Sequence, residues 1–187
     1  MKTNLSDFDF DLPPELIAQK PLARRGQSRL LVVDRNKQTL IHDKFSNLDQ
    51  YIKPSTLMVF NNTQVVPTKI FATLDHNNKL VEMILTRKIS SSIWEVLMKG
   101  KMKPGMKFNF QGSSLVAHFL RRDEERAVVE FSCAQSLSEY LGNFGRMPLP
   151  PYIQRTQNDA TSTLEQDKKR YQTVYASQAG AIAAPTA

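Results

Sequence analysis

Cysteine is almost absent from this chain of 187 residues, and long apolar runs are absent altogether. With Cys133 as the single cysteine, an intramolecular disulfide and a thiolate metal cluster from one chain are both excluded, and a reducing compartment is favoured. No uncharged apolar run approaches the roughly 20 residues of a membrane-spanning helix. Asp7, Asp9 and Asp11 interrupt the stretch in which an export signal would need its apolar segment. We therefore expect a cytoplasmic protein without membrane association.

The sequence also lacks most of the short motifs that carry catalytic chemistry. His42, His76 and His118 are remote from one another and show no metal-binding spacing. The seven glycines form no phosphate-binding loop, and no serine stands in the GxSxG pattern of hydrolases. Gly142 and Gly145 share the GxxG spacing of RNA-binding KH modules, a weak signal that arises often by chance. We expect no metal and no bound cofactor.

The composition is that of a folded protein with a mild basic excess. Hydrophobic residues make up 41% of the chain and charged residues 23%, which excludes disordered and coiled-coil classes. Lysine and arginine number 25 against 18 acidic residues, a net charge of +7. The basic residues gather in two places that suit phosphate contacts by counterion release, although a solvated surface explains the lysines equally well: Lys20, Arg24, Arg25, Arg29, Arg35 and Lys37, and then Lys99, Lys101, Lys103 and Lys107.

The first third of the chain mixes short helical and strand patterns. Pro13 and Pro14 precede the residues ELIAQ and predict a short helix with proline in its first turn. Residues 29–34 and 39–45 are apolar segments joined by a polar turn and predict a hairpin. The apolar residues 57–61 predict a further, buried strand.

Residues 67–133 show strand patterns at intervals of about 8 to 12 residues, the rhythm of a small barrel or sandwich. Alternation assigns one inward face to each strand: Trp94, Val96 and Met98; Met106, Phe108 and Phe110; Leu115, Ala117 and Phe119; Ala127, Val129 and Phe131. We expect three segments, with the first part of one domain at 1–66, a β subdomain at 67–144 and a return to the first domain at 145–187.

The last third begins with a helical pattern at 136–141 and then a loop at 145–155 that contains three prolines. The stiff loop suits a binding edge, but a cover over the junction of two subdomains is the more common role of such a loop. Ser162 and Glu165 form a capping-box pattern, which predicts a helix from Thr163 to Ala176. Leu164, Tyr171, Val174 and Tyr175 form its expected inner face. The final residues, AIAAPTA, carry no stop signal, so we expect the natural chain to continue.

Four blocks of the sequence, in this order, resemble one enzyme family. They are FDFDLPPELIAQKPLARRGQSRLLVVD at 8–34, VFNNTQVVPTKI at 59–70, GRMPLPPYIQR at 145–155 and KKRYQTVYASQAGAIAAPTA at 168–187. The chain is similar over essentially its whole length to the S-adenosylmethionine:tRNA ribosyltransferase-isomerases of queuosine biosynthesis.

The resemblance implies a fold and a reaction. The fold is an α/β domain interrupted by an inserted antiparallel β-barrel domain. The reaction moves the ribosyl group of S-adenosylmethionine onto the 7-aminomethyl-7-deazaguanine base at the tRNA wobble position, isomerises it to give epoxyqueuosine, and releases adenine and methionine. S-adenosylmethionine is then a substrate, tRNA is the partner, no metal is needed, and a monomer is expected.

The resemblance also assigns residues. Asp167 is a candidate acid or base, with Arg170 and Tyr171 orienting substrate. The other candidates for the substrate pocket come from the matching blocks: Asn61, Asn62, Thr63, Met147, Pro148, Tyr152, Gln172, Thr173, Ala184, Pro185 and Thr186. Gln64 and Lys69 depart from the arginines that the family usually carries, and the family's later glycine-led blocks are absent, which leaves the activity of this chain by itself open. Two other hypotheses remain, a non-catalytic RNA-binding module and a structural remnant of a split gene.

Overall fold

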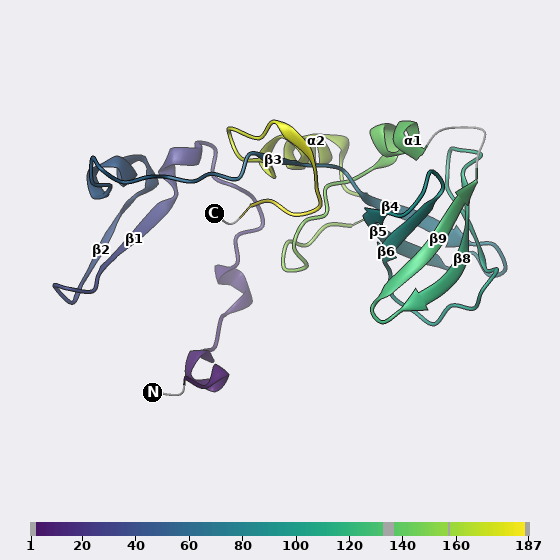
Figure 1. The fold of residues 1–187 in the computed structure, drawn as a ribbon, viewed down its shortest axis with the longest axis horizontal. Coiled ribbons are helices and arrows are strands. Elements are labelled where there is room, and N and C mark those ends of the chain that lie inside the picture. Colours follow the sequence, from purple (N-terminus) through teal and green to yellow (C-terminus); the bar gives the residue numbers. More distant parts are fainter. Residues whose placement is uncertain (1–2, 133–136, 157, 186–187) are drawn as a thin grey trace. The chain divides into compact units, whose positions relative to one another are not determined.

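Six strands in the middle of the chain close into an antiparallel barrel (Figure 1). The computed structural model describes residues 3–132, 137–156 and 158–185. Around the barrel the strands follow the order β4-β5-β6-β9-β8-β7. Their bounds are β4 Lys69–Leu74, β5 Leu80–Lys88, β6 Ile93–Leu97, β7 Lys107–Asn109, β8 Val116–Asp123 and β9 Arg126–Ser132. The strand rhythm left a barrel and a sandwich open; the structure shows the barrel that the family resemblance implies, and its strands lie between residues 67 and 144.

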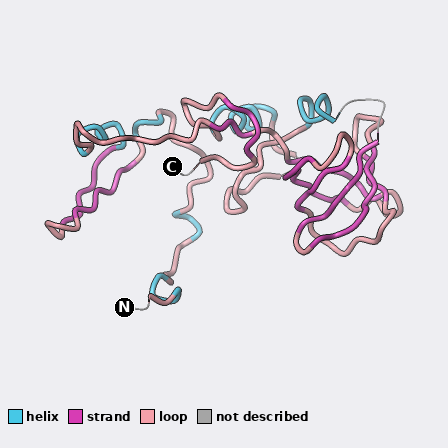
Figure 2. The backbone as a smooth tube through the Cα atoms, viewed as in Figure 1, coloured by secondary structure: helices cyan, strands magenta, loops and turns pink. Residues whose placement is uncertain are grey.

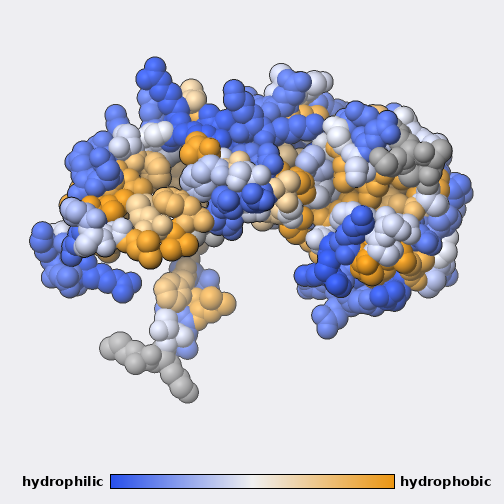
Figure 3. Space-filling view, turned by 45° about the horizontal axis from the view of Figure 1, so that its top comes forward, coloured by the Kyte–Doolittle hydropathy of each residue, from blue (hydrophilic) through white to orange (hydrophobic). Residues whose placement is uncertain are grey.

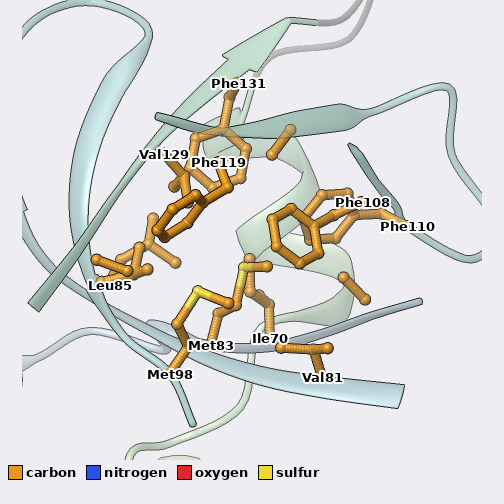
Figure 4. Close-up of a cluster of buried hydrophobic side chains, with 14 of the residues drawn as sticks. Ile70, Val81, Met83, Leu85, Met98, Phe108, Phe110, Phe119, Val129 and Phe131 are labelled. Atoms are coloured by element: carbon orange, nitrogen blue, oxygen red, sulfur yellow. The ribbon is translucent and has the colours of Figure 1, made fainter. Parts of the chain in front are cut away.

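The barrel encloses the main apolar core of the described chain. Phe108, Ile70 and Met83 have no exposed surface, and Phe119 is 2% exposed. Figure 4 shows these side chains pointing inward from different strands toward a common centre. Every predicted inward face belongs to this cluster, with Trp94 and Met106 partly buried at its edge. The alternation of the sequence therefore identified the core correctly.

A helix, α1 (Leu137–Phe144), packs its aromatic residues against the barrel core. The Tyr140 side chain is 3% exposed, and its ring meets that of Phe110 edge-on, with centroids 5.4 Å apart. The Phe144 ring stacks on Tyr140 at 4.8 Å. The helix predicted at 136–141 is confirmed as α1, while residue 136 and the neighbouring Cys133 lie outside the described residues.

The two glycines of the GxxG pattern belong to this helix and its end. Gly142 lies within α1, and Gly145 follows directly after it. A Cβ atom on Gly145 would collide with the carbonyl oxygens of Leu141 and Pro67, so this position requires glycine for close packing. Nothing lies within 4 Å of a Cβ atom built on Gly142, so close packing explains Gly145 alone. Because the pattern lies in a helix and at its end, it does not form the RNA-clamping loop of a KH module.

The barrel is an insertion between two neighbouring parallel strands. β3 (Thr63–Val65) precedes it and β10 (Gln178–Ala181) follows it, and the two pair in parallel with Gln178 opposite Thr63. α2 (Thr161–Arg170) lies between the barrel and β10 in the chain. A β–α–β unit with a barrel inserted after its first strand is the interrupted α/β arrangement that the family resemblance implies.

The observed α2 differs from its prediction at both ends. Its N-cap is Ala160, so Ser162 lies within the first turn and makes no capping bond. It ends at Arg170 and not at Ala176, because Tyr171 leaves the helical conformation and the next side chain, Gln172, bonds to β3. Val174, predicted on the inner face, is 78% exposed.

The chain divides into two compact units, residues 61–150 with 156–187, and residues 1–60 with 151–155. The second unit holds a hairpin of β1 (Arg29–Asp34) and β2 (Thr39–Lys44), which confirms that prediction. It also has 3-10 helices at Leu5–Phe8, Pro14–Leu16, Arg25–Gln27 and Phe45–Tyr51. The helix expected after Pro13 is thus a single 3-10 turn, and the backbone elsewhere in this unit is mostly loop (Figure 2). No helix in the described part of the chain is long and apolar enough to cross a membrane.

The strand predicted at 57–61 does not form. Residues 57–60 have no strand partner among the described residues, and Leu57 and Val59 are 88% and 81% exposed. An extended apolar segment becomes a buried strand only where another strand and a covering layer meet it. Apolar side chains are likewise exposed along the hairpin, as the orange surface at the left of Figure 3 shows.

Candidate functional site

The turn that leads into β3 is fixed by its own polar side chains. The Asn61 Oδ1 atom accepts a hydrogen bond from the backbone N–H of Thr63 at 3.0 Å, a local turn typical of asparagine. The carbonyl oxygen of Asn62 accepts from the backbone N–H groups of Ser177 and Gln178, at 2.8 and 3.2 Å. The Asn62 Nδ2 atom donates to Ser177 Oγ at 3.2 Å. The predicted residues 61–63 therefore lie against the start of β10.

Gln172 joins the end of α2 to β3. Its Oε1 atom accepts from the backbone N–H of Val65 at 2.9 Å, and its Nε2 atom donates to the Val65 carbonyl oxygen at 2.7 Å. The amide thus pairs with Val65 as a neighbouring strand would. Val65 is 3% exposed, so these groups depend on the glutamine for their hydrogen bonds. The Gln172 amide thus links the end of α2 to β3, and substrate binding by Gln172 stays a prediction.

α2 presents the candidate acid or base. Asp167 is 7% exposed although it carries a carboxylate, an uncommon position for an acidic side chain. The backbone N–H of Tyr171 donates to the Asp167 carbonyl oxygen at 2.9 Å and closes the helix. Lys168, Lys169 and Arg170 occupy the last turn, where positive charge is favourable. Tyr171, Arg170 and the following Thr173 are half-buried beside the β3–β10 pair, within the same compact unit.

The proline loop begins as an extension of the barrel. The backbone of Arg146 pairs with that of Lys69, through N–H to carbonyl bonds of 2.8 and 3.1 Å. Met147 is 5% exposed, and Pro148 is also buried. These two predicted site residues therefore contribute apolar packing at the base of the loop.

Tyr152 belongs to the other compact unit. Its side chain is 57% exposed, and its carbonyl oxygen accepts from Gln19 Nε2 at 3.0 Å. Gln19 also accepts from the backbone N–H of Gln154 at 2.7 Å, and its own carbonyl oxygen accepts from Arg155 Nη2 at 3.2 Å. Gln19 was absent from the predicted set, although it lies within the first of the four matching blocks, which was the available signal.

The last predicted residues follow β10. Ala184 and Pro185 are half-buried, and Thr186 lies outside the described residues. Within one unit, main-chain and side-chain hydrogen bonds thus join residues 61–63 to the start of β10, and Gln172 to Val65 of β3. Within the described ranges, no three His, Cys, Asp or Glu side chains come together as a metal site.

A cluster of cations and an aromatic ring was missed by sequence reasoning. The Arg146 guanidinium and the Lys69 ammonium lie 5.1 and 5.6 Å from the centroid of the Phe71 ring, within the range of cation–π attraction. Lys69 also pairs with Glu82 at 2.7 Å. Arg146 Nη1 donates to the carbonyl oxygen of Thr156 at 2.7 Å. Spacing in the sequence carries no signal for such a cluster, because Phe71 and Arg146 meet only once the barrel has closed.

Sequence comparison places these features in one family. A family model described as "Queuosine biosynthesis protein" matches residues 5–187, which includes every element of the site. The chain belongs to this family. The four matching blocks had predicted that membership, and it is confirmed.

Relatives within the queuosine biosynthesis family include an S-adenosylmethionine:tRNA ribosyltransferase-isomerase from Desulforamulus reducens, 41% identical over 186 residues. Another of the same name, from Staphylococcus aureus strain JH9, is 38% identical over 187 residues. Each match covers 98% of this chain and 52% of the relative. The chain therefore spans about half the length of the curated relatives it matches.

A solved structure within the family is that of an S-adenosylmethionine tRNA ribosyltransferase from Thermotoga maritima. It is 27% identical, and the match covers 93% of this chain and 56% of that one, with a TM-score of 0.37.

Proposed function

We propose that this chain forms part of an enzyme that transfers the ribosyl group of S-adenosylmethionine to the 7-aminomethyl-7-deazaguanine base at the tRNA wobble position and isomerises it. The products are epoxyqueuosine in tRNA, adenine and methionine. The observation that carries this proposal is 38–41% identity, over 98% of the chain, to relatives named for the reaction. That likeness extends over β3, α2 and β10, which hold the candidate site.

The chemistry begins at the sulfonium of S-adenosylmethionine. Its positive charge acidifies the adjacent ribose carbon, so a positioned base removes a proton there and starts the rearrangement. Two described carboxylates are buried, Glu95 and Asp167. Hydrogen bonds from Arg87, and then from Arg126, lower the pKa of Glu95 to about 2, which makes it a weak base. Asp167 is accordingly the residue we assign to the proton transfer.

The remaining roles follow from position. Tyr171 and Arg170 adjoin Asp167 at the end of α2, and we assign them to orienting the substrate. S-adenosylmethionine is consumed as a substrate, so no resident cofactor or metal is part of the proposal. The macromolecular partner is tRNA, the enzyme acts as a monomer, and the compartment is the cytoplasm.

Calorimetry with S-adenosylmethionine tests the class of function. We expect the 187-residue chain to bind S-adenosylmethionine more tightly than S-adenosylhomocysteine, which lacks the sulfonium charge. A chain that binds tRNA but neither nucleoside would be a non-catalytic RNA-binding module, and the proposal would be wrong.

Mass spectrometry of the tRNA nucleosides, together with measurement of released adenine, tests the assignment of Asp167. We expect Asp167→Asn to bind S-adenosylmethionine as the wild-type chain does and to release adenine about 10²–10⁴ times more slowly, the usual effect of losing a general base. Glu165→Gln is the matched control, because Glu165 is an exposed carboxylate on the same helix. Where the wild-type chain releases adenine, release by Asp167→Asn at the rate of Glu165→Gln and of the wild type would exclude Asp167 as the base.

A further inference from the structure

The net charge of the chain is concentrated in one continuous segment. Residues 96–122 contain six lysines and arginines and no aspartate or glutamate. The other 160 residues contain 19 basic and 18 acidic side chains. Six of the seven net positive charges therefore lie in 27 residues of the barrel, between the middle of β6 and the end of β8.

Ion pairs neutralise only part of this charge. Lys107 Nζ lies 3.6 Å from Asp75 Oδ1, and Arg121 Nε lies 3.0 Å from Asp123 Oδ2. Lys99, Lys101 and Lys103 are exposed, and no carboxylate of the described residues lies within 4.0 Å of their Nζ atoms. Arg122 donates to carbonyl oxygens and pairs with no described carboxylate, so its charge is uncompensated together with the charges of these three lysines.

All three lie in the lysine loop, residues 98–106, which joins β6 to β7. The loop is anchored by its alternate residues: Met98 is 7% exposed, and Met102 and Met106 pack against the barrel core. Anchoring of the even-numbered methionines leaves the odd-numbered lysines on the solvent side. The loop therefore holds its three lysine side chains on one side of a backbone that is packed against the barrel.

Hydrogen bonds from β8 hold the same loop. Arg122 Nη2 donates to the carbonyl oxygens of Met98 and Gly100, at 3.2 Å each. The backbone N–H of Gly105 donates to the Phe119 carbonyl oxygen at 2.8 Å. Gly100 and Gly105 have φ values of +104° and +84°, which glycine adopts without strain. Binding to a loop already fixed in this way costs little conformational entropy.

A groove of about 870 Å³ adjoins the lysine loop. Lys79, Lys99 and Arg122 line it together with an apolar set that includes Leu80, Leu97 and Met102. Glu82, which Lys69 neutralises, and Glu125 also line it. A row of exposed cations suits a ligand that presents phosphates at regular intervals, since phosphate contacts hold and position a nucleic acid.

We propose that the lysine loop is a docking surface for the phosphate backbone of RNA. The inference rests on the proposed function, because tRNA is the polyanion that such an enzyme must hold. It adds the location: the inserted barrel carries the electrostatic contact, through Lys99, Lys101 and Lys103, on elements separate from β3, α2 and β10.

Salt-dependent binding of an unmodified tRNA transcript, followed by fluorescence anisotropy between 50 and 200 mM KCl, tests this surface. The variant is Lys99→Gln/Lys101→Gln/Lys103→Gln in the 187-residue chain. Each phosphate contact contributes about 0.9 to the slope of log K against log salt for duplex and about 0.7 for single strands. The slope of log K against log salt should therefore be smaller in magnitude by about 2 to 2.7 for the triple variant than for the wild type. Between 50 and 200 mM KCl, the tRNA affinity of the wild type should then decrease by a factor about 15–40 times larger than that of the variant.

The matched control replaces three exposed lysines elsewhere, Lys44, Lys53 and Lys88, with glutamine. It changes the net charge equally and should keep the wild-type slope. An equal loss in both variants would show a general charge effect and overturn the proposal, as would an unchanged slope in the first variant or no tRNA binding by the wild-type chain.

Calorimetry with S-adenosylmethionine is run on the same samples. The two lysine variants should bind the nucleoside like the wild-type chain, which also shows that they are folded. Loss of nucleoside binding in the wild-type chain, with the slope difference intact, would refute the proposed reaction and leave the RNA surface standing.

Discussion

Replacing Gln172 with leucine removes the two hydrogen bonds that join α2 to β3. The Val65 N–H and carbonyl groups then lose their partners at 2.9 and 2.7 Å, in a residue that is 3% exposed. An unsatisfied buried polar group costs about 1–3 kcal/mol. Water reaches part of the vacated space because Gln172 itself is half-buried. We therefore expect the variant to lose about 2–4 kcal/mol of unfolding free energy.

Urea and thermal unfolding measure this loss. For a chain of this length, 1 kcal/mol corresponds to about 2–4 °C in Tm, so we expect a decrease of about 5–10 °C. Gln166→Leu is the control, because it makes the same chemical change at an exposed position of α2 and removes neither of these bonds. Unchanged stability in Gln172→Leu, combined with loss of S-adenosylmethionine binding, would show that Gln172 acts as a ligand and would refute the structural role argued here.

In the variant Gln172→Glu, pH decides whether one or both of the hydrogen bonds to Val65 can form. A carboxylate still accepts from the Val65 N–H but cannot donate to the Val65 carbonyl oxygen, whereas the protonated acid does both. The folded state therefore favours the protonated form and raises the pKa of the introduced carboxyl above its unfolded value of about 4.3. The stability it contributes is present below that value and is lost as the pH rises through the folded pKa. Gln172→Glu should approach wild-type stability only in acid.

Three further predictions concern the barrel. Hydrogen bonds, first from Arg87, lower the pKa of Glu95 from 4.5 to about 2. The stability that the Glu95 carboxylate contributes should therefore be present above about pH 4.5 and be lost as the pH falls toward 2. The difference in urea midpoint between the wild type and Glu95→Gln should shrink over that interval. Gly145→Ala should lose about 1–3 kcal/mol by urea unfolding, since its Cβ meets backbone atoms that cannot move aside, and a wild-type midpoint would contradict the packing described. Phe119→Ala should lose about 3–5 kcal/mol in the same assay, because the ring is 2% exposed at the barrel centre; a loss under 1 kcal/mol would show that the core is loosely packed.

The barrel was predictable because its signal is local and repeated. Alternation of apolar and polar residues has a period of two, and it recurs on successive strands between turn residues. Phe108 and Phe110, or Ala127 and Val129, therefore show their inward face without knowledge of the neighbouring strand. Strand order and closure are not local, since β6 pairs with β9 across two intervening strands.

The errors lie where a distant partner decides the structure. The pattern at 57–61 predicts a strand from composition alone, and the chain that is described supplies no strand to pair with it. The helix predicted to reach Ala176 ends at Arg170, because the Gln172 amide bonds to Val65, 107 residues away. Propensity describes what a segment prefers by itself. At 57–61 the strand partner that this preference requires is missing from the described residues, and after Arg170 a tertiary hydrogen bond ends the helix.

The candidate site residues were proposed from the matching blocks, which say nothing about the geometry of the site. The blocks include Asn62 and Gln172, but they carry no information about which polar atoms of these residues bond within the fold. Ser177 bonds to Asn62, and Gln19 bonds to the backbone of the loop that carries Tyr152. Neither role could be seen without the contacts in the structure.

The inserted barrel affects the site even though its core residues do not line it. Asn62 and Ser177 are bonded across 115 residues, and closing a loop of that length has an entropic cost that grows with the logarithm of its length. The paired backbones of Lys69 and Arg146 bring the entry and exit of the barrel together, which shortens the flexible path to roughly 40 residues and lowers the closure cost by about 1 kcal/mol. A defect at the barrel centre, such as Phe119→Ala, should therefore weaken the β3–β10 pair as well, because the low closure cost of that pair depends on an intact barrel.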